Sequence, residues 1–182
     1  MKTVHKTPNI GKGTFISEHA VVMGNVTIGD NVFVAPNATI RCDEPGSSVE
    51  IGDGCNIQDN VVIHGVMGST VRIGKGVSVG HGAIIHGPCE VGDRTFIGFG
   101  AVLFRCDIGS ECAVMHRAVL IGVALPDRRM VSPGVVMDGN RAHDHDELTD
   151  EMRNFSETVQ AVNEMLAKEY LSMGQDITID KD

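Results

Sequence analysis

Residues 71–98 read VRIGKGVSVGHGAIIHGPCEVGDRTFIG, and an aliphatic residue returns at every sixth position within them. The same spacing continues in both directions, with two insertions and one contraction, and defines 18 positions occupied only by Ile, Val or Leu: Ile10, Ile16, Val22, Ile28, Val34, Ile40, Ile51, Ile57, Ile63, Ile73, Val79, Ile85, Val91, Ile97, Leu103, Ile108, Val114 and Leu120. A short fixed period is typical of solenoids in which three six-residue strands complete one triangular coil. The sequence therefore predicts an all-β solenoid, a parallel β-helix whose narrow core holds the repeat residues.

Glycine and cysteine take regular places beside the repeat positions. Glycine often follows a repeat residue, where we expect tight corners, at Gly29, Gly52, Gly74, Gly92, Gly98 and Gly109. Four cysteines lie two residues before a repeat residue and are interpreted as small buried side chains: Cys55, Cys89, Cys106 and Cys112. Cys42 lies outside this position, and its role stays open. Five cysteines without a CxxC motif argue against a disulfide framework and favour a cytoplasmic protein.

The C-terminal part of the chain follows a different pattern. We expect one domain, with the β-helix over residues 1–140 and a linker and helix of the same domain over residues 141–182. The acidic stretch 144–150 is interpreted as the linker. Apolar residues then recur at three- and four-residue steps, which predicts an amphipathic helix along one wall of the prism: Met152, Phe155, Val159, Val162 and Leu166. Gly174 is expected to end this helix.

Charge and hydropathy exclude several classes of partner. The net charge of −9 opposes binding to nucleic-acid phosphates and to anionic membrane surfaces. The apolar runs are too short to cross a bilayer, and the first 12 residues lack the apolar core of a secretory signal. We therefore expect no nucleic acid and no membrane among the partners.

Two histidines fall one coil apart in the predicted register. His64 follows Ile63 and His86 follows Ile85, and the extra residues between them bulge out as a loop within 65–70. Stacked strands bring such positions to roughly 4.8 Å from each other. Two imidazoles at that separation can share a Zn²⁺ ion.

His81 lies on another face, because it follows Val79 by two residues and comes one repeat before His86. It can join the other two histidines only from a neighbouring chain, which predicts a three-histidine site at the interfaces of a homotrimer. Arg41 stacks beneath His64, and Asp59 stacks beneath His81 with Gln58 beside it. The same packing brings Arg41 of one chain towards Asp59 of another, although both also fit ordinary solvated charges.

Several segments that carry these residues resemble the γ-class carbonic anhydrases: residues 40–44 (IRCDE), 56–59 (NIQD), 62–64 (VIH), 81–88 (HGAIIHGP) and 91–98 (VGDRTFIG). The resemblance covers roughly residues 10–136 and, more weakly, the C-terminal helix. It implies a left-handed coil, with His64 and His86 as metal ligands from one subunit and His81 as the ligand from its neighbour. It also assigns Arg41, Asp43 and Asp59 to an interface network, and Gln58, Asn56 and Asn163 to the lining of the site. The implied metal is Zn, with Fe(II) or Co as alternatives.

Two departures from the family pattern concern proton transfer. The loop at residues 65–70 lacks the glutamate that the resemblance would place there, and Ala161 stands where a tyrosine is expected. The sequence thus resembles the short-loop branch of the family. Glu44 is the nearest carboxylate in a matching motif that can substitute, unless it is simply a solvated loop acid.

The resemblance implies metal-dependent, reversible hydration of CO₂ to bicarbonate. Two alternatives stay open at this point. One is acyl transfer or thioester hydrolysis on an acyl-CoA, with a histidine as general base and no metal. The other is a metal-stabilised trimer without catalysis. A chain of this charge offers no obvious basic groove for the phosphates of coenzyme A.

Overall fold

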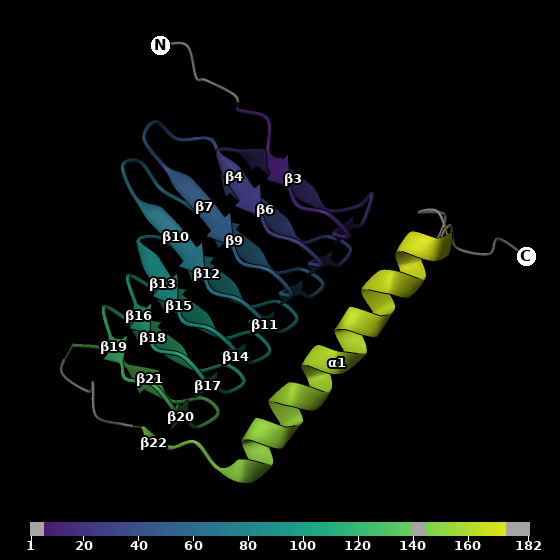
Figure 1. Ribbon diagram of the computed structural model, residues 1–182. Helices are drawn as coiled ribbons and strands as arrows, with labels where there is room; N and C mark the ends of the chain where they lie inside the picture. The colour runs from purple at the N-terminus through teal and green to yellow at the C-terminus, as the bar shows by residue number, and fades with distance from the viewer. Residues whose placement is uncertain (1–5, 140–144, 174–182) are drawn as a thin grey trace, which may run out of the picture.

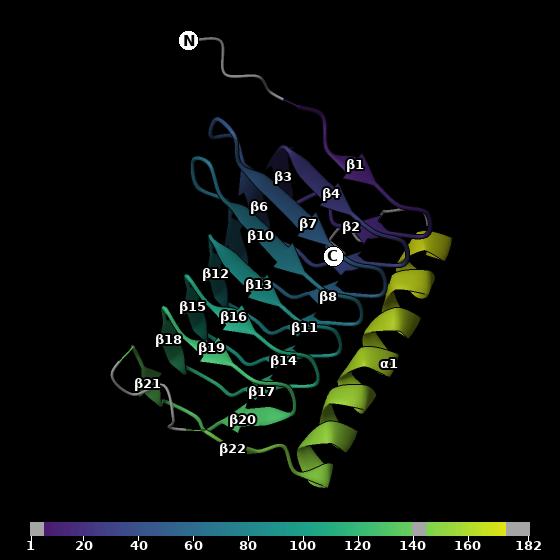
Figure 2. The ribbon, with the colours of Figure 1, turned by 60° about the vertical axis from the view of Figure 1, so that its left-hand side comes forward.

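The computed structural model describes residues 6–139 and 145–173. The chain forms a left-handed parallel β-helix of about seven turns, with one helix along its side (Figures 1 and 2). Three sheets form the walls of the prism, and each described strand pairing is parallel except that of β20 with β22. The predicted fold class is confirmed.

Each wall contains every third strand of the solenoid. Wall A consists of β1 (Asn9–Ile10), β4 (Val26–Ile28), β7 (Ser48–Ile51), β10 (Thr70–Ile73), β13 (Cys89–Val91), β16 (Asp107–Ile108) and β19 (Ala124–Leu125). Wall B consists of β2 (Phe15–Ile16), β5 (Phe33–Val34), β8 (Asn56–Ile57), β11 (Ser78–Val79), β14 (Phe96–Ile97), β17 (Ala113–Val114), β20 (Arg129–Val131) and β22 (Asp146–Glu147). Wall C consists of β3 (Val21–Gly24), β6 (Thr39–Cys42), β9 (Val62–His64), β12 (Ile84–His86), β15 (Val102–Phe104), β18 (Val119–Ile121) and β21 (Val136–Met137).

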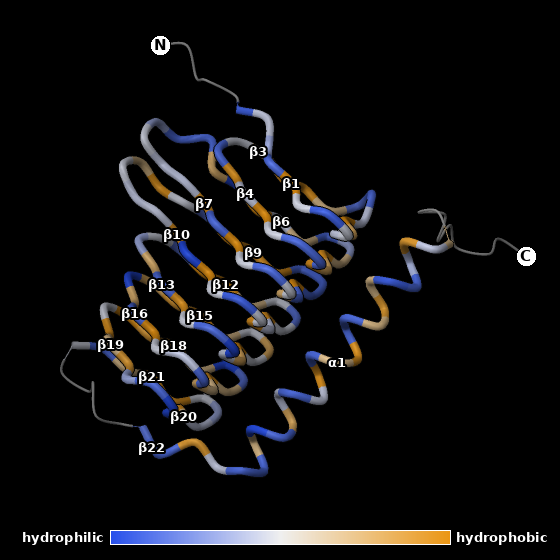
Figure 3. Tube along the Cα trace, in the orientation of Figure 1, coloured by the Kyte–Doolittle hydropathy of each residue, from blue (hydrophilic) through white to orange (hydrophobic). Residues whose placement is uncertain are grey.

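The repeat residues fill the core as predicted from Ile28 to Leu120, where every one of them is buried. Apolar residues recur along each coil as the repeat dictates (Figure 3). The prediction that every repeat residue lies in the core is wrong for Ile10, which is 39% exposed, and Ile16 and Val22 are only partly buried. These residues belong to the first coil, which has a neighbouring coil on one side only.

The glycines that follow repeat residues are needed for a different reason from the one expected. A Cβ atom on Gly52 would lie 2.7 Å from the carbonyl carbon of Gly74, and one on Gly74 would lie 2.8 Å from the backbone nitrogen of Asp93. Successive coils therefore approach too closely here for any side chain. The left-handed backbone at this corner occurs instead at Gly54 and Gly76, with φ of 66° and 63°.

The helix α1 (Asp150–Met173) lies along wall B and contacts β2, β5, β8 and β11 (Figure 1). It buries Met152, Asn163 and Ala167, whereas Phe155 and Val162 of the predicted stripe are exposed. The stripe prediction is wrong at these two positions, because Gln58 and Ser78 beside wall B donate hydrogen bonds to Asn163 and Gln160 of the helix and so set which face it presents.

The segment expected to be a linker is partly ordered as a strand. Asp146 and Glu147 form β22 and pair with Met130 and Arg129 of β20. Asp144 and Gly174, the expected start of the linker and end of the helix, lie outside the described residues. No helix in the described part of the chain is long and apolar enough to span a membrane.

All five cysteines are buried and unpaired. Burial raises the pKa of the Cys55 and Cys89 thiols to about 12. Cys42 is also buried, and its thiol donates to Ser47 Oγ over 3.0 Å, which anchors the start of the β6–β7 loop. The structure thus gives Cys42 a packing role.

Candidate metal centre

His64 and His86 lie side by side on the outer face of wall C. Strands β9 and β12 pair in register, so that His64 is the direct neighbour of His86, and Arg41 on β6 is the neighbour of His64. His64 Nδ1 lies 3.3 Å from His86 Nε2, and the rings meet edge to face with centroids 5.1 Å apart. The repeat spacing placed these residues one coil apart, and the backbone register shows the same stacking.

The chemistry of this pair fits a metal ligand set. A tetrahedral Zn²⁺ with Zn–N distances near 2.0–2.1 Å holds its ligand nitrogens about 3.3–3.4 Å apart, which is the separation of the pair. His64 Nε2, on the opposite side of the ring from this contact, is buried without a hydrogen-bond partner and faces Glu44. Burial is the largest cause that lowers the pKa of His64, and the nearby Arg41 and His86 lower this pKa further. This direction favours the neutral ring, which is the form that binds a metal.

Three charged side chains surround His64. Glu44 Oε1 lies 3.5 Å from His64 Nε2, and Glu44 Oε2 accepts a hydrogen bond of 2.7 Å from the backbone nitrogen of Met67. Arg41 Nε donates to Asp43 Oδ1 over 2.7 Å, and this bond lowers the pKa of Asp43. Within one chain, Arg41 therefore has Asp43 as its partner, and Asp59 lies elsewhere.

His81 occupies the corner between walls B and C, directly after β11. Its Nδ1 lies 2.9 Å from Asp59 Oδ2, one coil below, and its side chain is 52% exposed. Because a carboxylate only accepts hydrogen bonds, this contact places a proton on Nδ1, and in the neutral ring it leaves the lone pair of Nε2 for a metal. The described residues contain no group of three or more His, Cys, Asp or Glu arranged to hold a metal. One chain thus presents two candidate half-sites, the His64–His86 pair on wall C and His81 at this corner.

Gln58 lies in a chain of hydrogen-bonded amides next to Asp59. Gln58 Nε2 donates to Asn56 Oδ1 over 2.9 Å and to Asn163 Oδ1 over 2.7 Å, and Asn163 Nδ2 donates to the carbonyl of Val159 on α1. Both amide hydrogens of Gln58 are thereby used. Gln58 Oε1 is left as an acceptor, which makes Gln58 suited to orient a ligand that donates an O–H.

The chain is similar in sequence to proteins of a known family. Residues 7–42 and 70–105 match the family described as bacterial transferase hexapeptide (six repeats). A carbonic anhydrase of Methanosarcina thermophila is 38% identical over 90% of this chain and 74% of its own length. The chain belongs to the γ-class carbonic anhydrase family.

Other relatives share less of their length or only the fold. The carboxysome assembly protein CcmM of Nostoc is 36% identical over 89% of this chain, which spans 31% of that protein. The UDP-N-acetylglucosamine acyltransferase of Campylobacter jejuni has a TM-score of 0.57 at 18% identity, covering 91% of this chain and 86% of its own, which shows a common fold alone.

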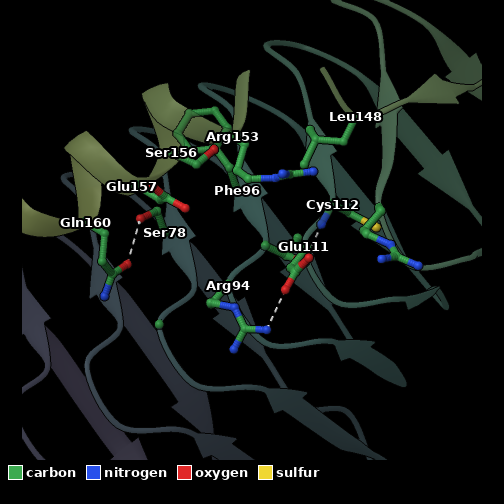
Figure 4. A pocket seen from close by; sticks show the side chains of 13 residues that line it. Ser78, Arg94, Phe96, Glu111, Cys112, Leu148, Arg153, Ser156, Glu157 and Gln160 are labelled. Atoms are coloured by element: carbon green, nitrogen blue, oxygen red, sulfur yellow. Dashed lines mark hydrogen bonds and ion pairs between the residues drawn. The ribbon is translucent and has the colours of Figure 1, made fainter. Parts of the chain in front are cut away.

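In this γ-class family member, the hydrogen-bonded chain that begins at Gln58 continues through two residues that the sequence did not indicate, Ser78 and Gln160. Asn56 Nδ2 donates to Ser78 Oγ over 2.6 Å, and Ser78 donates in turn to Gln160 Oε1 on α1 over 3.3 Å (Figure 4). Ser78 is the direct neighbour of Asn56 in the register of β8 and β11, so the repeat arithmetic contained that signal. The contact of Gln160 with Ser78 could not be predicted from the sequence, because the repeat of the strands does not specify where the helix docks.

Two of the pockets beside α1 are lined by aromatic side chains of wall B. One, of about 310 Å³, is lined by Phe96, Leu148 and the ion pair of Arg94 with Glu111, and contains none of the three histidines (Figure 4). The other, of about 320 Å³, is lined by Phe15, Phe33 and Tyr170 and reaches Gln58 and Asp59. The second pocket therefore adjoins the corner half-site.

An apolar ladder runs beside the histidines on wall C. It consists of outward-facing residues in register on successive strands: Val21, Thr39, Val62, Ile84, Val102, Val119 and Val136. Val21, Val62, Ile84 and Val136 are exposed in the single chain. An exposed apolar face of this kind marks a surface for association.

Proposed function

We propose that this protein is a metal-dependent enzyme that hydrates CO₂ to bicarbonate at sites shared between the subunits of a homotrimer. The observation that carries the proposal is the division of the three histidines. His64 and His86 form a pair with the spacing of metal ligands on wall C, and His81 is held by Asp59 at a separate corner of the same chain.

A threefold axis parallel to the prism supplies the missing contact. Packing the His81 corner of one chain against wall C of the next brings three imidazoles together at each interface. The apolar ladder on wall C supplies surface for that packing, and Arg41 of one chain then approaches Asp59 of another. Each chain contributes both half-sites, so that one site forms per interface.

The ligand set and its surroundings fit hydration chemistry. The neutral imidazoles of His64, His86 and His81 would hold a divalent metal, which would supply a nucleophile at neutral pH by lowering the pKa of water to about 7. Gln58, with both amide hydrogens held by Asn56 and Asn163, accepts an O–H hydrogen bond and so fixes the orientation of the attacking oxygen or of bicarbonate. Glu44, whose Oε1 lies 3.5 Å from His64 Nε2, is our candidate for the carboxylate that receives the proton.

A second candidate function is assembly without catalysis. It is favoured by the similarity to the carboxysome assembly protein of Nostoc over nearly the whole of this chain. In that case the same three histidines would hold a metal that stabilises a trimer. Acyl transfer is supported by the match to the hexapeptide-transferase family and by the fold shared with acyltransferases, both of which are less specific than the arrangement of the three histidines.

Metal analysis, sedimentation and a CO₂-hydration assay on anaerobically purified protein test these functions together. We expect a trimer with one divalent metal per chain, identified as Zn, Fe(II) or Co, and hydration that disappears in His64→Ala and His86→Ala. A metal-loaded trimer without hydration activity would favour assembly. A monomer that holds its metal tightly would refute the shared site. The five unpaired cysteines fit a reducing cytoplasm as the place where it works.

A further inference from the structure

A column of rings in contact continues upward from His81 along the corner between walls B and C. The Phe99 ring lies on the coil above, with its centroid 5.2 Å from that of His81 and its plane tilted by 48°. His116, one coil higher, stacks on Phe99 with centroids 4.4 Å apart and planes only 19° from parallel. Asp59 below and Phe99 above thus enclose the His81 ring from two sides.

The upper part of this column is fixed by more than stacking. The backbone nitrogen of Phe99 donates to His116 Nδ1 over 3.0 Å. The His116 ring also meets the buried Phe96 edge to face, and Phe96 in turn meets Phe155 of α1. The exposed end of the column is therefore joined to the packed contact between wall B and the helix.

Two glycines make room for these rings. A Cβ atom on Gly80 would lie 2.7 Å from Cδ1 of Phe99, and one on Gly98 would lie 2.6 Å from the backbone nitrogen of His116. The residues before His81 and Phe99 are therefore restricted to glycine by the rings and by the backbone of the coil above. Phe99 itself remains 44% exposed, so packing in the core of its own chain does not explain an aromatic side chain at this position.

We infer that Phe99, held in place by His116, is a positioning residue that fixes the His81 ring for binding a metal shared with the next subunit. Asp59 directs Nδ1, and the Phe99 ring restricts rotation of the imidazole, so that Nε2 points in one direction before the metal arrives. This inference rests on the proposed function. It adds to the site a residue that touches neither metal nor substrate and acts only through His81.

Zinc affinity of the assembled protein tests the inference without recourse to activity. Metal-free protein is titrated with Zn²⁺ against a competing chelator for the wild type, Phe99→Ala, Phe99→Tyr and Leu171→Ala. Residues that orient a ligand typically alter metal affinity by 10–100-fold, and we expect a loss on the order of 10-fold or more in Phe99→Ala. Phe99→Tyr keeps the ring and should bind as the wild type does. Leu171→Ala, which removes an exposed apolar residue of α1, should also bind normally.

A double-mutant cycle separates positioning from a general structural effect. In a His81→Ala background the Phe99→Ala change should have no further effect on the remaining Zn²⁺ affinity, because the ring it positions is gone. Cobalt-loaded Phe99→Ala should show an altered visible absorption spectrum, whereas Phe99→Tyr should not. His116→Ala should weaken binding in the same direction.

The outcomes distinguish this inference from the proposed function. If His81→Ala loses Zn²⁺ and Phe99→Ala binds it within twofold of the wild type, the positioning role is overturned and the shared site stands. If His81→Ala retains full Zn²⁺ affinity, the shared site itself is overturned. Loss of equal size on Phe99→Ala with and without His81 would show a structural effect and would also overturn the positioning role.

Discussion

His81 and Asp59 meet within one chain, with Nδ1 and Oδ2 2.9 Å apart across two neighbouring coils. The sequence placed Asp59 beneath His81 but assigned its carboxylate to Arg41 of another chain. In the structure, Asp59 Oδ2 faces Nδ1 of the histidine that we expect to reach the neighbouring subunit, and so favours a proton on that nitrogen. The contact with His81 uses only one oxygen of the Asp59 carboxylate, so the other oxygen can still accept a hydrogen bond from Arg41 of a neighbouring chain.

Replacing Asp59 should therefore weaken metal binding although Asp59 is not a ligand. We expect Asp59→Ala to lower Zn²⁺ affinity by about 10–100-fold, and Asp59→Asn, which keeps an acceptor oxygen, to lower it less. Chelator competition measures both. Equal affinity in Asp59→Ala and the wild type would contradict a role for the carboxylate in orienting His81.

His81→Ala should cost both metal and association. His81 is exposed in the single chain and contributes nothing to its core, so the fold should be retained. The apolar ladder on wall C is unaltered, so part of the trimer should survive at high protein concentration. Sedimentation across a concentration series and metal analysis measure the two effects. A variant that loses neither would show that His81 is not part of the site.

Proton export should limit turnover, because the loop between β9 and β10 carries no acid. Turnover should rise with the concentration of a small buffer while kcat/KM stays nearly constant. Met67 is 65% exposed and its backbone nitrogen is held by Glu44, so Met67→Glu should raise turnover in weak buffer if its carboxylate reaches the site. Glu44→Ala should lower turnover if Glu44 relays the proton. Indifference to buffer would indicate another route.

The repeat core should be sensitive to single truncations that its outward neighbours tolerate. Ile108 is buried and the adjacent Asp107 is exposed on the same strand. We expect Ile108→Ala to lower the free energy of unfolding by about 2–5 kcal/mol and Asp107→Ala to change it by less than about 0.5 kcal/mol. Denaturant unfolding at one fixed protein concentration measures the difference. Equal effects would place Ile108 outside the core.

The buried thiols should destabilise the fold at high pH. Burial raises the pKa of Cys55 and Cys89 to about 12, above the ordinary value of about 8.5 that the unfolded chain regains. Below about pH 8.5 both states hold the thiol proton, and above it only the unfolded state releases it, so stability falls as pH rises towards 12. For each protein, the unfolding midpoint between pH 8 and 11 is compared with its own midpoint at pH 7. The midpoint should fall less in the double variant Cys55→Ala/Cys89→Ala than in the wild type. Native thiols should also resist alkylation until the protein unfolds.

The sequence by itself determined the solenoid and the vertical neighbours within it. Strands in a solenoid pair in register with the coil below at a constant rise, so a fixed period converts distance along the chain directly into position in space. For this reason the stacking of His64 on Arg41 and beneath His86, and the placement of His81 on another face, followed from counting residues.

Only the tertiary structure decided how side chains on these positions pair. Arg41 turns to Asp43, two residues away, and Phe99 stacks on His116, choices of rotamer that the period does not encode. Gln58 and Asn163 meet across 105 positions because α1 docks where wall B offers polar groups that need partners. Burial of a hydrogen-bonding group without a partner is costly, so the helix presents Asn163 to wall B and leaves Val162 exposed. That preference depends on both surfaces at once, and no repeat within either surface specifies it.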